Sequence, residues 1–162
     1  MLFPEAPDLP GSAALLLLRL VGGAALVIHG YGKMKTPLTW MGDDTWAPGF
    51  LQAIAAFSEF GGGIAWLLGL LTVPASVLFL GTMVVAVSTH LSRGEPFVGP
   101  GGAASELAAL YLAVATVFIA MGPGRFAVDF VITHHRANVG PSPTRRSHES
   151  RQEGNDRSHR YA

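Results

Sequence analysis

The stretch "FSEFGGGIAW", Phe57 to Trp66, places one carboxylate, Glu59, and three consecutive glycines among apolar side chains. It lies inside an apolar run from Phe50 to Leu70, close to the roughly 20 residues that a helix needs to cross the hydrocarbon core of a bilayer. A charge at that depth costs several kcal/mol unless it faces a partner or a cavity. Because glycines let membrane helices approach closely, the stretch predicts a membrane helix whose carboxylate faces the inside of a helical bundle.

The composition of the chain is typical of a membrane protein. Of its 162 residues, 49% are hydrophobic and 14% are charged, whereas an average soluble domain has about 25% charged residues. The expected partner is therefore the lipid bilayer, and we expect no nucleic-acid partner. The chain has no cysteine, which excludes a structural disulfide, a thiolate nucleophile and an iron–sulfur cluster held by this chain alone.

Apolar segments of membrane-spanning length occur four times, so the sequence predicts an all-α integral membrane four-helix bundle with short loops. Pro74 suits the first turn of a helix, so we expect a tight reversal between the second and third spans. An acidic N-terminus and Arg19 argue against a cleaved signal peptide, and the first span is expected to stay in the protein. The predicted organisation is an N-terminal segment 1–11, a domain 12–132 with spans near 12–31, 50–70, 73–91 and 104–121, and a disordered, Arg-rich tail 133–162.

The basic residues predict how the protein lies in the membrane. Arg125 follows the last span, with Arg136, Arg145 and Arg146 beyond it, while the loop between the second and third spans has no Lys or Arg. The positive-inside rule places this C-terminal end in the cytoplasm. Because the predicted number of spans is even, we expect the N-terminus to be cytoplasmic too.

Helical spacing places two intramembrane charges on stripes of small residues. Arg19 shares a face with Gly22 and Gly23, and Glu59 shares a face with other glycines. With a rise of about 1.5 Å per residue, an extended arginine could cover the difference in depth between Arg19 and Glu59. We therefore predict a buried Arg19–Glu59 charge pair, which either fixes the helix register or handles a ligand or protons.

A second group of polar residues gathers toward the opposite, outer end of the predicted bundle. Glu106 could instead be a helix N-terminal residue favoured by the macrodipole, and Lys33 and His90 could be interfacial. Axial ligation of a haem by His29 and His90 is a further alternative, but no spacing typical of a metal site is present. No catalytic residue is identified. The predicted polar pocket consists of His29, Lys33, Gln52, His90 and Glu106.

Read in order, four pieces of the sequence resemble the DoxX family of small four-span bacterial membrane proteins. The resemblance covers about Leu15 to Asp129 and implies a protein of the bacterial cytoplasmic membrane that crosses it several times. The matching family features are a first-span arginine with a downstream HGxxK-like element, an E-x-x-GG second span, an E-L-A fourth span and a closing GPGR motif. They correspond here to "LRLVGGAALVIHGYGKM" (Leu18–Met34), "FSEFGGGIAWLLGLLT" (Phe57–Thr72), "ASELAALYLAVA" (Ala104–Ala115) and "GPGRFAVD" (Gly122–Asp129).

The resemblance also implies a functional context. The family takes its name from a small subunit of a thiosulfate:quinone oxidoreductase, so it makes a quinone a candidate ligand and other membrane subunits candidate partners. No covalently bound cofactor is implied, and a homo-oligomer is an open alternative. Three functions follow: a subunit of a quinone-linked oxidoreductase complex, a non-catalytic structural subunit, or a small-solute transporter.

Arg125 and Asp129 of the closing motif are four residues apart in the sequence. This is the i, i+4 spacing of neighbours on a helix surface. We expect them to form a pair at the inner membrane interface.

Overall fold

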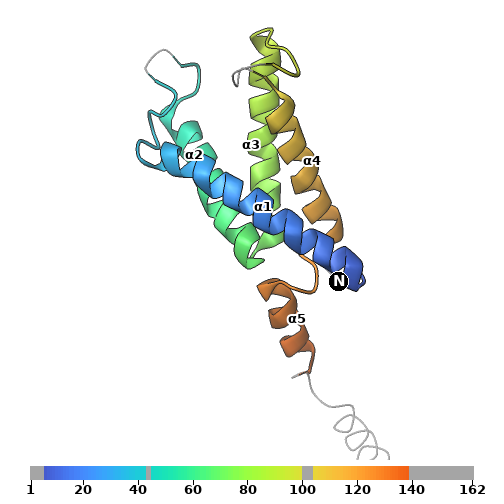
Figure 1. Cartoon of the computed structure of the whole chain (residues 1–162). Helices are drawn as coiled ribbons and strands as arrows, with labels where there is room; N and C mark the ends of the chain where they lie inside the picture. The colour runs from blue at the N-terminus through green and yellow to red at the C-terminus, as the bar shows by residue number, and fades with distance from the viewer. Residues whose placement is uncertain (1–5, 43–44, 100–103, 139–162) are drawn as a thin grey trace, which may run out of the picture. The chain divides into compact units, whose positions relative to one another are not determined.

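The computed structural model describes residues 6–42, 45–99 and 104–138, and this part of the chain is all-helical, as predicted (Figure 1). Two compact units are separated at Val131, and the described part of the second unit is the end of the last helix, residues 132–138. The helices are α1 (Leu9–Met34), α2 (Gly49–Leu68), α3 (Thr72–Ser92), α4 (Glu106–Met121) and α5 (Val128–Asn138).

Three of the described helices, α1, α2 and α3, are long and apolar enough to cross a membrane. Helix α4 is also apolar but shorter, with 16 residues. It begins at Glu106, two residues after the predicted start of the fourth span. The fold is therefore a helical bundle of membrane-protein character, with α4 as its short member.

The first helix is longer than predicted at both ends, since the predicted span was 12–31. It begins at Leu9, because the Asp8 side chain accepts a hydrogen bond from Gly11 N at 3.0 Å and so caps the helix, with proline in its first turn. Asp at this position and Pro just after it are strong helix-start signals. At the other end the helix extends to Met34, so Lys33 lies in its last turn.

The end of α5 overlaps the start of the expected tail. Helix α5 continues through Thr133 to Asn138, so the first six residues that we expected in the tail are helical. The reason is that a polar sequence can remain helical where it need not bury an apolar face. The rest of the predicted disordered tail, 139–162, lies outside the described residues, as do residues 1–5 of the predicted N-terminal segment.

Helices α1 and α2 approach closely where each carries a glycine. A Cβ atom on Gly23 would lie 2.8 Å from the carbonyl oxygen of Gly63, and a Cβ atom on Gly63 would lie 2.8 Å from the carbonyl oxygen of Gly23. Any larger residue would therefore push the helices apart. By contrast, a Cβ atom on Gly61 would meet nothing within 4 Å, so only part of the triple-glycine run is a contact surface.

An aromatic cluster fills the middle of the bundle. The Trp66 ring of α2 packs edge-on against Phe79 of α3 and Phe118 of α4, with centroid distances of 5.4 and 4.7 Å. All three side chains are fully buried. The Trp66 indole also donates a hydrogen bond to Ser76 Oγ at 2.9 Å, so its polar atom is satisfied and the ring orientation is fixed.

Candidate functional site: a polar cavity at one end of the bundle

A cavity of about 180 Å³ lies among helices α1 to α4, on the side of the aromatic cluster where α1 and α3 end. Every one of the four helices contributes to its wall. Leu26, Phe79 and Met83 supply apolar surface, and the polar side chains that line it are His29, Lys33, Glu59, His90 and Tyr111.

An ion pair between α1 and α2 forms one wall of the cavity. Lys33 Nζ lies 2.5 Å from Glu59 Oε1 and 4.3 Å from the centre of the Trp40 ring, in a cation–π contact. The Glu59 side chain is only 6% exposed, and its second oxygen, Oε2, is buried without a hydrogen-bond partner in the described structure. A buried polar atom without a partner is rare in folded proteins, so Oε2 is an acceptor that the described structure leaves unused.

A second pair lies at the rim of the cavity. His90 Nδ1, at the end of α3, is hydrogen-bonded to Glu95 Oε2 in the following turn. The Glu95 backbone N–H donates to the His90 carbonyl at 3.1 Å, and Arg93 lies 4.0 Å from the other Glu95 oxygen. Because Nδ1 is engaged, the imidazole orientation is set by the carboxylate. The prediction missed Glu95, since only the turn after the helix brings it back to His90.

His29 of α1 and Tyr111 of α4 complete the polar lining. His29 is exposed, and Tyr111 packs edge-on against Phe79 with ring centroids 5.8 Å apart. Tyr111 was not among the predicted pocket residues. Its spacing could have revealed it. Tyr111 lies three residues after Ala108 and four before Ala115, which are both buried and mark the inner face of α4.

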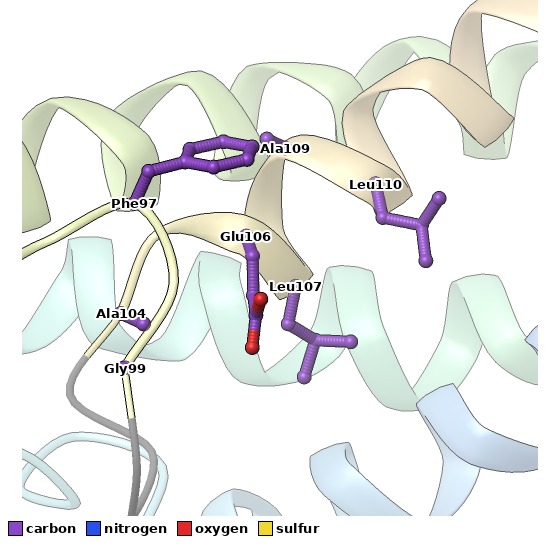
Figure 2. A pocket seen from close by; sticks show the side chains of 7 residues that line it. All are labelled: Phe97, Gly99, Ala104, Glu106, Leu107, Ala109 and Leu110. Atoms are coloured by element: carbon purple, nitrogen blue, oxygen red, sulfur yellow. The ribbon is translucent and has the colours of Figure 1, made fainter.

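Two predicted members of the pocket lie elsewhere. The Gln52 side chain accepts from Met41 N and donates to the Ala47 carbonyl, both at 2.9 Å, while its backbone carbonyl accepts from the Trp40 indole at 2.9 Å. Gln52 therefore fastens the α1–α2 loop. Glu106 is exposed on the first turn of α4 and lines a separate groove (Figure 2). Gln52 and Glu106 lie at the same depth in the bundle as the other predicted pocket residues, but their side chains do not face the cavity.

The predicted Arg19–Glu59 pair is wrong as a contact. Arg19 is 1% exposed, and its Nε donates to the Trp66 carbonyl at 2.8 Å, near the end of α2. Its other donors reach the carbonyls of Pro123 at 3.0 Å, Phe126 at 3.1 Å and Leu67 at 3.4 Å. Helical side chains lean toward the N-terminus of their own helix, which carries Arg19 away from Glu59 and carries Lys33 toward it.

Arg125 and Asp129 have other partners than the predicted i, i+4 contact. Arg125 Nε donates to the Pro7 carbonyl at 2.7 Å. The Asp129 carboxylate accepts from the backbone N–H groups of Leu71 at 2.8 Å and Thr72 at 2.9 Å. Leu71 has a φ of 52°, which is costly for a branched side chain, so Asp129 stabilises a strained turn and caps α3.

Membrane-length apolar helices with charges facing inward identify an integral membrane protein. The DoxX family model matches residues 14–91, from α1 to α3, and the predicted resemblance is confirmed over this part of the chain. The "ASELAALYLAVA" and "GPGRFAVD" pieces lie beyond the matched range and stay a prediction. No curated protein and no solved structure matches the chain.

Proposed function

We propose that this DoxX protein is a small subunit of a quinone-linked membrane oxidoreductase complex and that the cavity binds the quinone ring. The observation that carries the proposal is the buried, unpartnered Oε2 of Glu59, a residue that lines a cavity formed by four helices. An ionised carboxylate oxygen that accepts no hydrogen bond in a buried site is costly. A ligand that brings a hydroxyl donor would remove that cost.

The lining suits both redox forms of a quinone. A reduced ring carries two hydroxyl donors, and Glu59 Oε2 can accept from one of them. An oxidised ring carries two carbonyl acceptors, to which Lys33, Tyr111 or a protonated histidine can donate. The cavity volume of about 180 Å³ is below the 300–1,000 Å³ typical of sites for drug-sized molecules, so it suits a single ring.

The residues at the rim support a role in proton transfer. Bound quinone would accept two electrons and two protons. Because this chain has no cysteine to hold an iron–sulfur cluster or form a dithiol, the proposal assigns the supply of electrons to a redox-active partner subunit. His90, oriented by Glu95, lies between the cavity and the exposed loop, and it can pass protons inward as a general acid. On the predicted topology, this end of the bundle faces the outside of the cell.

Binding to the purified protein tests the proposal. The protein is placed in lipid nanodiscs with a dimethoxy-methyl-benzoquinol that carries one isoprene unit, and bound quinol is measured by chromatography. Because a charge-assisted hydrogen bond contributes about 1.5–3 kcal/mol, Glu59→Gln should weaken quinol binding about tenfold or more. Glu106→Gln is the matched control, since it removes a carboxylate outside the cavity. Equal binding by wild type and Glu59→Gln would refute the proposed site.

A non-catalytic structural subunit is the second candidate. Gly61 on α2 and Gly81 on α3 are exposed, and a Cβ atom on either would meet nothing within 4 Å. Such open small-residue positions suit the approach of another membrane helix. A transporter is less well supported, because Trp66, Phe79 and Phe118 fill the bundle between the cavity and Arg19.

A further inference from the structure

A groove on the outside of the bundle lies next to the cavity. It has a volume of about 690 Å³ and is lined by the first turns of α4 together with Phe97, Gly99 and Ala104 (Figure 2). Phe97 comes from the loop, and Ala109 and Leu110 come from α4. Figure 2 shows the Phe97 ring reaching over the helix toward Ala109. The groove is therefore a hollow in the apolar surface of α4.

The groove and the cavity share a wall. Ala104 and Leu107 line both of them. Ala104 is buried and small, whereas the Leu107 side chain is 46% exposed, so the boundary between the two spaces consists of small or partly free side chains. A molecule with its ring among Glu59, His90 and Tyr111 could leave the cavity past Leu107 and continue in the groove.

The chemistry of the groove indicates what would occupy it. Phe97 and Leu110 are 63% and 62% exposed, which gives the groove an apolar lining. Glu106 is the charged residue among its described lining, and a carboxylate repels the phosphate of a membrane lipid. An uncharged hydrocarbon chain therefore fits better than an anionic lipid.

We infer that the groove holds the isoprenoid tail of the molecule whose ring occupies the cavity. This inference rests on the proposed function and narrows it: the substrate class is a quinone with a polyisoprenoid chain, and small water-soluble quinones are poor ligands. Ala109 is the residue that determines this preference, because it lies in the groove and does not line the cavity. A large side chain there would fill the groove and leave the ring site intact.

The test compares two quinones with the same dimethoxy-methyl-benzoquinone ring, one with a single isoprene unit and one with four. Binding to nanodisc-embedded protein is expressed per mole of quinone in the bilayer, so that partition into lipid cancels. Wild-type protein should prefer the long chain by about tenfold, because packing of the tail in the groove adds van der Waals contacts that the short quinone lacks. Ala109→Phe should abolish the preference and leave binding of the short quinone within about twofold of wild type.

Ala120→Phe is the matched control. It makes the same change on the exposed side of α4, about 16 Å farther along the helix, and should keep the wild-type preference. Equal affinity of wild type for the two quinones would overturn the tail site while leaving the ring site standing. Binding of neither quinone would overturn the proposed function itself. A groove occupied only by phospholipid, which the long quinone does not displace, would also overturn the inference.

Discussion

Each end of the bundle holds a charged residue of α1, and the two residues differ in their hydrogen-bond partners. At one end every arm of the Arg19 guanidinium donates to a backbone carbonyl, and the residue is buried. At the other end Lys33 pairs with Glu59, and the carboxylate keeps one oxygen without a partner beside a cavity. We refer to these as the closed end and the open end.

The difference shows how to separate structural from functional charges in a membrane. The Arg19 donors are used by the fold, and Asp129 lies close enough to act on its charge, so the closed end has little capacity left for a ligand. Glu59 keeps one oxygen, Oε2, that accepts no hydrogen bond within the described structure. A buried charge that keeps a hydrogen-bonding atom unused by the fold is therefore a better candidate for a ligand site than one that is merely buried.

The largest expected effect comes from Arg19→Met, which would break the closed end. Several carbonyls at the end of α2 and in the segment after α4 would lose a charged donor, and we expect a loss of about 3 kcal/mol or more in the free energy of unfolding. The measurement is unfolding of the purified protein by increasing sodium dodecyl sulfate, followed by tryptophan fluorescence. Arg93→Met, at a position 54% exposed, is the control. A stable Arg19→Met protein that has lost quinone binding would reverse the assignment of the two ends.

A smaller effect is expected from Gly63→Ala, which tests the helix contact that joins the two ends. The new Cβ atom would lie 2.8 Å from the Gly23 carbonyl, and such overpacking costs about 1–3 kcal/mol. Gly61→Ala adds the same methyl group two residues away, where nothing lies within 4 Å. That control should be neutral or slightly stabilising in the same unfolding assay. Equal losses for both variants would contradict the contact.

Asp129→Ala should cost about 1–2 kcal/mol, the range for loss of a helix cap. The carboxylate accepts from Leu71 N and Thr72 N, and its charge also acts on Arg19. Unfolding of Asp129→Ala, Arg19→Met and the double variant forms a cycle. Since the residues share the closed end, the double variant should lose less than the two single losses combined. Additive losses would mean that Asp129 serves the turn alone.

The smallest effect is expected from Glu95→Gln at the open end. The His90 and Glu95 side chains are 28% and 21% exposed, and ion pairs this accessible to water contribute about 0–1 kcal/mol. The variant should unfold within about 1 kcal/mol of wild type in the same assay. A loss as large as that of Arg19→Met would show that the open end is as structural as the closed one.

Much of the fold followed from the sequence because hydropathy and length decide which helices suit a bilayer. The positions of Arg19 and Glu59 inside the bundle also followed from their small-residue stripes. The pairing of these charges could not be predicted, because depth along a helix does not define the direction in which each side chain leans. Lys33 lies nearly four turns after Arg19 on α1, yet its lean brings it to Glu59.

The rest of the site depended on loop geometry. Gln52 and Glu106 have the right height for the pocket, but one holds the α1–α2 loop and the other faces the outer groove. Glu95 reaches His90 only because the turn at Gly94, with a φ of 67°, reverses the chain. Periodicity describes a helix face and carries no information about such turns.

The bonds of Arg19 also order the events of biosynthesis. Its partners at Pro123 and Phe126 follow it by 104 and 107 residues, so the first helix is made long before they exist. If helices insert first and associate afterwards, α1 enters the bilayer with a charge that the later segment has yet to satisfy. The set of bonds around Arg19 is therefore complete only when the segment from Pro123 to Phe126 has been made: a chain that ends before Pro123 leaves Arg19 Nη1 without its two carbonyl partners.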